Sequence, residues 1–144
     1  MPAKAKYPVN AVSRETEPER VTLRFPKSAR LLKHSDFQHV YKNGKRHFSG
    51  VLTAFYFFRE GSAEGPRIGL TVGRALGGSV ERNRIKRRMR EAVRMHLPEL
   101  SANVDLVFNP KKVVLSAEFT LIAQEVKRAF EVVQKNADRR SKGI

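Results

Sequence analysis

The residues best suited to chemistry form a dense run of cations. Between residues 82 and 94 the chain has six Arg, one Lys and a single Glu, so this run carries +6 of the formal net charge of +15. The guanidinium group of Arg donates paired hydrogen bonds to phosphate and stacks on unpaired bases. Because like charges four residues apart on a helix repel each other, such a run calls for a polyanion to neutralise it. The run predicts nucleic-acid binding; a bare basic surface and a membrane-lying helix are the alternatives.

Side chains for acid–base, metal or nucleophilic chemistry are scattered by comparison. The chain has 14 Asp or Glu, no Cys and 4 His: His34, His39, His47 and His96. The His residues lack the spacing of metal ligands, and none has a nearby carboxylate suited to acid–base work. No acidic cluster could hold the two metal ions of a protein nuclease. We therefore predict no catalytic residue and no metal site, and we expect the polypeptide to bind rather than to cleave.

Length and composition bound the architecture. The chain has 144 residues, which is enough for one folded domain. Because 40% of them are hydrophobic, complete disorder is not expected. We expect a disordered basic extension over residues 1–28, a folded domain over 29–136 and a basic tail over 137–144. No window approaches the roughly 18 apolar residues of a membrane span, and no secretory signal or Cys is present. We therefore expect a cytoplasmic protein with no membrane partner.

The cations belong to a predicted helix over residues 81–96. Four apolar side chains fall within a stripe of about 100° on this helix: Ile85, Met89, Ala92 and Val93. We predict that the stripe faces the core and that the Arg side chains cover the rest of the circumference. Upstream, residues 77–79 lack the Lys of a nucleotide-binding loop. They are predicted to form a turn in which Ser79 caps the helix.

A shorter helix is predicted over residues 35–43. Ser35 and Gln38 form a capping-box pattern, and the Asn-Gly pair at 43–44 is typical of a left-handed helix end. One face carries three large side chains at spacings of three and four residues: Phe37, Val40 and Tyr41. These side chains either belong to the core or edge a surface on which unpaired bases stack. The sequence leaves both open.

Runs of β-branched and aromatic residues predict four strands, at 45–49, 51–58, 66–73 and 104–109. The third is expected to pair antiparallel with the second across a polar turn at 59–65. The second strand is apolar on both faces: Val51, Phe55 and Phe57 on one, and Leu52, Ala54, Tyr56 and Phe58 on the other. Either helices cover both faces, or one face is a ligand surface.

A last helix is predicted toward the end of the chain. Ser116 is placed to cap it, and apolar side chains keep helical spacing from Phe119 to Val133. The predicted elements therefore follow the order α-β-β-β-α-β-α.

The region around the Arg-rich helix resembles a family signature. Residues 67–72 (RIGLTV), followed by residues 80–91 (VERNRIKRRMRE), closely resemble the signature of the bacterial ribonuclease P protein component. Supporting matches lie at residues 30–44 and 105–107. The resemblance spans roughly residues 30–135.

The resemblance implies a fold. It is an α+β fold, a two-layer α/β sandwich of the same element order, with a left-handed βαβ crossover through the basic helix. Periodicity predicts the order of the elements but not that hand, because parallel crossovers are right-handed in almost all proteins.

The resemblance also implies a role. The family's protein pairs with the large catalytic RNA of ribonuclease P, and this endoribonuclease removes the 5′ leader of precursor tRNA. Mg²⁺ is then expected mainly on the RNA subunit, and no obligate protein partner is evident. A stand-alone RNA-binding or ribosome-associated module is the alternative.

Two sets of site residues follow from the resemblance. Eight are expected to bind RNA: Arg74, Arg82, Asn83, Arg84, Lys86, Arg87, Arg88 and Arg90. Three are expected to line a cleft between the first helix and the sheet that takes the single-stranded leader: Phe37, Tyr41 and Phe55. The chain departs from the family at Ala75, which replaces one cation of a usual Lys pair, and at Asn109, where a basic residue is usual.

Overall fold

The fold is taken from a computed structural model that describes residues 29–31, 33–60 and 65–142. Within these residues, three helices and four strands follow one another as α1 (His34–Asn43), β1 (Lys45–Phe48), β2 (Leu52–Phe58), β3 (Arg67–Leu70), α2 (Ser79–His96), β4 (Val104–Pro110) and α3 (Phe119–Lys142). This confirms the predicted element order. Short 3-10 turns lie at Arg74–Leu76 (η2), Leu97–Glu99 (η3) and Lys112–Leu115 (η4). The extension predicted over residues 1–28 lies outside the described residues.

The four strands form one mixed sheet in the order β1-β2-β4-β3. β4 pairs antiparallel with β2 on one side and parallel with β3 on the other. The prediction that residues 66–73 pair antiparallel with the second strand is therefore wrong. β4 is buried at every residue but Asn109, and a strand with both faces covered belongs in the middle of a sheet. Because β3 and β4 pair in parallel, α2 forms a crossover between them. The left-handed sense of this crossover stays a prediction.

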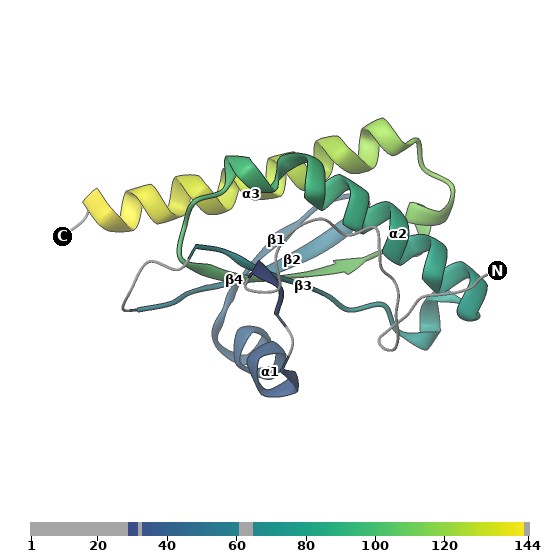
Figure 1. The fold of residues 1–144 in the computed structure, drawn as a ribbon, viewed down its shortest axis with the longest axis horizontal. Coiled ribbons are helices and arrows are strands. Elements are labelled where there is room, and N and C mark those ends of the chain that lie inside the picture. Colours follow the sequence, from purple (N-terminus) through teal and green to yellow (C-terminus); the bar gives the residue numbers. More distant parts are fainter. Residues whose placement is uncertain (1–28, 32, 61–64, 143–144) are drawn as a thin grey trace.

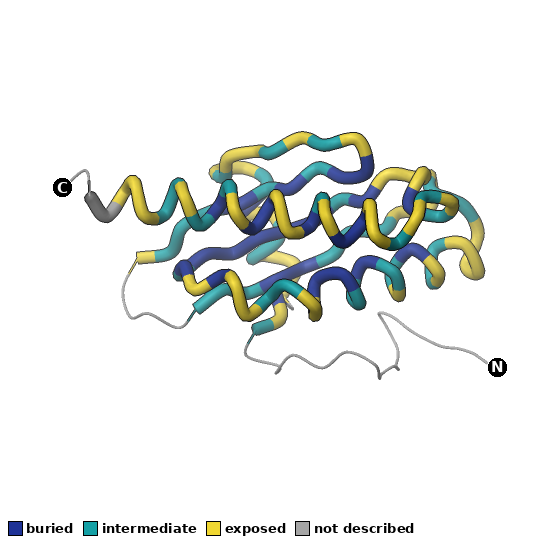
Figure 2. Tube along the Cα trace, turned by 90° about the horizontal axis from the view of Figure 1, so that it is seen from above, coloured by how far each residue is buried: buried dark blue, intermediate teal, exposed yellow. Residues whose placement is uncertain are grey.

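Helices lie on both faces of this sheet. α2 and α3 run along one face, and α1 covers part of the other (Figure 1). The predicted α+β sandwich is confirmed. Of the two alternatives for the second strand, helices on both faces holds in part, because Phe55 and Phe57 stay half-buried beside α1. The ligand-surface alternative stays a prediction. Along α3, buried and exposed residues alternate as on a helix with one core-facing side (Figure 2).

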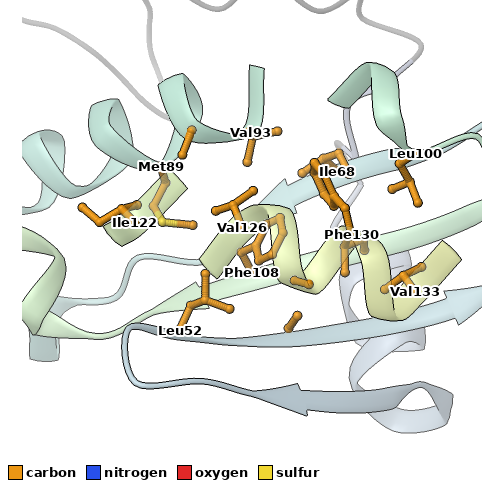
Figure 3. Packing of buried hydrophobic residues seen from close by; sticks show 14 of the residues in the cluster. Leu52, Ile68, Met89, Val93, Leu100, Phe108, Ile122, Val126, Phe130 and Val133 are labelled. Atoms are coloured by element: carbon orange, nitrogen blue, oxygen red, sulfur yellow. The ribbon is translucent and has the colours of Figure 1, made fainter. Parts of the chain in front are cut away.

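The larger core fills the space between the sheet and the helix pair. Phe108 of β4 meets Phe130 of α3 with ring centroids 5.9 Å apart, and both side chains are fully buried (Figure 3). Burying one such side chain contributes about 1.5–3 kcal/mol. Val51 also packs here, so its predicted place on the face of Phe55 is wrong. It precedes β2, and strand alternation does not apply to it.

A smaller core lies between α1 and the opposite face of the sheet. Its buried residues are Leu31, Val40 and Val107, and partly buried aromatic rings pack against them: Phe37, Tyr41, Phe55 and Phe57. The first helix therefore supplies one core residue and two aromatic side chains that remain partly accessible. The core alternative therefore holds for Val40, and base stacking on the two rings stays a prediction.

The predicted helix caps are wrong. α1 begins at His34 after Lys33, and α2 begins at Ser79 after Gly78; neither has a side-chain cap hydrogen bond. Ser116 closes η4 instead of capping α3, and α3 begins at Phe119. Serine alone does not decide a helix start, because packing of the apolar face selects the first turn.

Gly44 also differs from its prediction. Its backbone is extended, with φ −85° and ψ 171°, and not left-handed. A Cβ atom at this position would lie 2.6 Å from the carbonyl oxygens of Val40 and Tyr56. The position therefore requires glycine because α1 and β2 approach closely here.

The segment predicted as a basic tail continues α3 to Lys142. Asn136 donates a hydrogen bond to the hydroxyl of Tyr56 at 2.7 Å. The guanidinium of Arg140 lies 4.8 Å from the ring centre of Phe58 and 3.6 Å from a carboxylate oxygen of Glu60. These contacts tie the end of α3 to the end of β2. Within the described ranges, no helix is both long enough and apolar enough to cross a membrane.

Candidate nucleic-acid interface

α2 presents the cations because its apolar stripe is buried. Ile85, Met89, Ala92 and Val93 are all buried, as predicted. The charged residues must then occupy the remaining circumference. Arg84 and Arg87 are exposed there, while Arg82, Lys86 and Arg90 are half-buried along one flank. The helix thereby turns a local sequence pattern into a one-sided basic surface.

The half-buried cations are close enough to destabilise one another's charge. Burial, together with the charges of Arg90 and Arg82, lowers the pKa of Lys86 to about 7. Burial and the charges of Arg30 and Arg87 lower the pKa of Arg90 to about 10. Desolvation and like charges both disfavour a cation. An anion bound at this flank would relieve both effects.

We define the cationic flank as Arg30, Arg82, Lys86 and Arg90. Arg30 was missing from the predicted site residues. It precedes α1 in sequence, but its backbone bridges to Ile68 of β3, and its charge acts on Arg90 of α2. No local pattern could have placed it there, because the contact depends on sheet pairing.

Arg88 lies on the opposite flank of α2. One of its guanidinium nitrogens donates to the carbonyl oxygens of Val114 and Leu115 at 2.8 and 3.2 Å, and the other donates to that of Ala117 at 2.7 Å. These bonds join α2 to the segment that leads into α3. The structure gives Arg88 a role in packing that its place in the Arg-rich run did not predict.

The remaining predicted RNA contacts lie at the start of α2. Arg82 donates through Nε to the carbonyl oxygen of Gly77 at 3.1 Å, which orients its side chain toward the turn before the helix. Arg74 is exposed on η2, and Asn83 is half-buried on the first turns of α2. Together they extend the basic surface to the end of β3.

The predicted aromatic residues are brought together on the other face of the sheet. The rings of Tyr41 and Phe55 are 4.9 Å apart in a T-shaped arrangement. The hydroxyl of Tyr41 donates to Oδ1 of Asn109 at 3.0 Å and lies 2.6 Å from the Thr71 hydroxyl. Since the single proton of Tyr41 goes to Asn109, the Thr71 hydroxyl donates to Tyr41. These bonds hold the ring in one orientation over the ends of β3 and β4.

Phe37 lies against β3. A Cβ atom on Gly69 would come within 2.6 Å of its ring carbon Cζ. The absence of a side chain at Gly69 therefore makes the space that the ring occupies. We define the aromatic surface as Phe37, Tyr41 and Phe55, all of which are half-buried.

A buried carboxylate ties α1 to the sheet. Asp105 is 4% exposed and accepts two hydrogen bonds from Arg67, both at 2.8 Å, and one from Arg59 at 2.7 Å. Arg67 also lies 3.7 Å from a carboxylate oxygen of Asp36 in α1. Because Phe37 follows Asp36, this network fixes the helix turn that carries the aromatic ring. The described residues contain no group of three or more His, Asp or Glu that could hold a metal ion.

The arrangement can bind a polyanion on one side and unpaired bases on another. Arg and Lys side chains gathered on one flank of a helix are suited to phosphate, and half-buried aromatic rings are suited to base stacking.

Comparison with known proteins agrees with the sequence signature. The sequence profile of the Ribonuclease P family matches residues 25–134. The ribonuclease P protein component of Finegoldia magna is 40% identical over 86 residues, which are 60% of this chain and 74% of that protein.

The fold is similar to that of solved ribonuclease P proteins. The Staphylococcus aureus protein superposes with a TM-score of 0.65 at 24% identity, covering 75% of this chain and 97% of that one. The Thermotoga maritima protein superposes with a TM-score of 0.62 at 23% identity, covering 70% of this chain and 94% of that one.

Proposed function

The chain belongs to the ribonuclease P protein family, and from that premise we propose that it is the non-catalytic protein subunit of the endoribonuclease. In this proposal it binds the catalytic RNA and the 5′ leader of precursor tRNA in the cytoplasm, so that the complex removes the leader. The observation that carries the proposal is the cationic flank of α2, where burial and neighbouring cations lower the pKa of Lys86 and Arg90.

In this proposal the catalytic RNA lies against α2. The cationic flank and the exposed Arg84 and Arg87 contact its phosphates, and Asn83 and Arg74 extend the contact toward β3. Arg88 does not contact the RNA in this proposal. It holds α2 in place from the opposite flank, because its donors are bonded to backbone carbonyls. Binding is then expected to weaken steeply with salt, since each neutralised phosphate releases counterions.

The leader is proposed to lie on the aromatic surface. Unpaired bases stack on accessible rings, and each stack contributes about 1–3 kcal/mol with little dependence on base identity. Tyr41 is held by Thr71 and Asn109, so its ring is already oriented before a base arrives. A subunit that must accept leaders of many sequences is expected to use such contacts.

The chemistry is assigned to the RNA. The Mg²⁺ ions of the reaction are proposed to lie mainly on the RNA subunit, and the described residues offer no cluster suited to a metal. We therefore assign no chemical step to a polypeptide side chain. The protein's own contribution is to position substrate and to neutralise phosphate charge.

Reconstitution tests the proposal. The protein is combined with a bacterial ribonuclease P RNA, and cleavage of precursor tRNA is measured at low Mg²⁺. We expect faster cleavage than with RNA alone, because the cations replace part of the Mg²⁺ that screens the RNA–substrate contact. If cleavage were no faster than with RNA alone, the proposal would be wrong and the stand-alone RNA-binding module would be the remaining alternative.

Replacing Phe37 tests the leader surface. Phe37→Ala is expected to weaken binding of precursor tRNA by roughly 5-fold or more, since a base stack is lost, and to leave binding of mature tRNA unchanged. Phe37→Leu, which keeps apolar packing of α1 against β3, serves as the control for folding. Equal losses for precursor and mature tRNA would assign Phe37 to the core alone.

A further inference from the structure

A row of side chains crosses the sheet beside the aromatic surface, from β3 to β1. We define the transverse row as Thr71, Asn109, Thr53 and Phe48. Asn109 is opposite Thr53 in the β2–β4 pair, and Thr53 is opposite Phe48 in the β1–β2 pair. At the other end, Thr71 follows β3 and donates its backbone N–H to the carbonyl of Phe108, next to Asn109.

The row lies on the same face of the sheet as the aromatic surface. Thr53 and Phe55 are two residues apart on β2, so their side chains point to the same side. Tyr41 connects the two groups directly, because its hydroxyl is bonded to both Thr71 and Asn109. Three inter-strand spacings give the row a length of about 14 Å, several times the roughly 3.4 Å that one nucleotide occupies along a stacked strand.

Phe48 stands out at the end of this row. Its side chain is 66% exposed, whereas Thr71, Asn109 and Thr53 are half-buried. A single exposed apolar residue is ordinary on a protein surface. Phe48, however, continues a line of accessible groups that begins at the ordered ring of Tyr41. The position of Phe48 at the end of this line, more than its exposure, indicates a ligand contact.

Two cations lie near Phe48, and the carboxylate of Glu125 acts on the neighbouring His47. Arg46 lies two residues earlier on β1, with its guanidinium carbon 5.6 Å from the ring centre of Phe55. On the other side, the ammonium of Lys111 donates to the carbonyl of Ser49 at 2.7 Å. Residues 44–59 and 106–117 contain no Asp or Glu. An exposed aromatic ring with cations on neighbouring positions is an arrangement that proteins use for single-stranded nucleic acid.

We propose that the transverse row carries a single-stranded RNA segment from Tyr41 to Phe48, where a further unpaired base stacks on the Phe48 ring and Arg46 and Lys111 contact the adjoining phosphates. The inference rests on the proposed function, because the segment is then the distal part of the precursor leader. It adds a stacking position on the edge strand β1, beyond the three aromatic residues already assigned.

Leader length provides the test. The holoenzyme is reconstituted with Phe48→Ala, and its affinity is measured for precursor tRNA with a long single-stranded leader and for one whose leader is too short to pass Tyr41. We expect about a tenfold loss for the long leader, within the range for one lost base stack, and no loss for the short one. Phe48→Trp is expected to restore the affinity for the long leader, since it keeps an aromatic face.

Leu121→Ala is the matched control. Leu121 is also an exposed apolar residue, at 42%, but it lies on α3. It is expected to change neither affinity. Equal losses with both leaders, or no loss with Phe48→Ala, would overturn the proposal. So would a change in oligomeric mass of Phe48→Ala with unaltered leader affinity, because Phe48 would then serve a protein contact.

The two proposals fail in distinguishable ways. If the wild-type protein does not stimulate cleavage, the proposed function fails whatever Phe48 does. The same variants are then compared for binding of a single-stranded oligoribonucleotide by the free full-length protein. A tenfold loss with Phe48→Ala and recovery with Phe48→Trp would support the transverse row as an RNA surface, and equal binding by all variants would overturn it.

Discussion

The cationic flank and the aromatic surface are built by opposite means. Three of the four residues of the flank come from successive turns of one helix, and burial of the stripe on the other side of α2 forces them outward. The aromatic surface collects residues from α1 and β2. It relies on Gly69 of β3, on Thr71 just after β3 and on Asn109 of β4. One site is local in sequence, and the other exists only after the sheet has formed.

The two surfaces also differ in how they would hold a ligand. The cations of α2 repel one another, so a bound phosphate stabilises them. Binding by these cations is expected to weaken as the salt concentration rises. The aromatic rings are fixed by hydrogen bonds and packing before a base binds, and stacking depends less on charge. We infer that α2 supplies affinity for RNA, while the aromatic surface selects unpaired segments.

The largest expected effect falls on the framework of the aromatic surface. Asp105→Ala should lower the free energy of unfolding by about 3–5 kcal/mol, because it leaves Arg59 and Arg67 without their buried carboxylate. Urea denaturation measures this. Glu131, an exposed residue on α3, gives the control Glu131→Ala, with an expected change within about 0.5 kcal/mol. A similar small change for Asp105→Ala would show that α1 is held by other contacts.

Two neighbours on α2 separate binding from packing. Arg88→Gln should lower the free energy of unfolding by about 1–3 kcal/mol, because the carbonyls of residues 114, 115 and 117 lose their donor. Arg87→Gln, at an exposed position, should leave stability unchanged. It should instead lower the salt slope of RNA binding by a little under one, the value for one phosphate. If the two variants behaved alike, the division of α2 into two flanks would be wrong.

The smallest expected effect is on pH dependence. The pKa of Lys86 is lowered to about 7 in the free protein, and a bound phosphate should raise it. Binding therefore takes up a proton above pH 7, so affinity should be constant below that pH and fall as pH rises through 7 to 9. In Lys86→Arg the side chain stays charged over this range, and this decline should disappear. Identical pH profiles of the two proteins would place Lys86 outside the RNA contact.

Local patterns predicted the parts of the molecule whose structure is local. The apolar stripe of α2 is correct at all four residues, because helical periodicity alone determines which side chains share a face. The helix caps at Ser35, Ser79 and Ser116 failed, since hydroxyl caps contribute only about 1 kcal/mol and core packing outweighs them. Phe37 and Tyr41 were correctly paired on one helix face for the same reason as the α2 stripe.

Long-range pairing could not be predicted in the same way. The sequence predicted a hairpin between the second and third strands, because neighbouring strands usually pair. In the structure β4 lies between them. That insertion brings Asn109 beside Tyr41 and aligns Thr53 between Asn109 and Phe48. The contacts of the aromatic surface and the whole transverse row depend on it.

The sequence by itself thus determined that this protein has one strongly basic helix and an apolar stripe to anchor it. Those properties follow from charge and from a repeat of 3.6 residues. The tertiary structure alone decided that Arg30 joins the cationic flank, that Arg88 turns away from it and that four strands present one continuous face. The reason is that these contacts join residues far apart in the chain, and only the choice of the central strand brings them together.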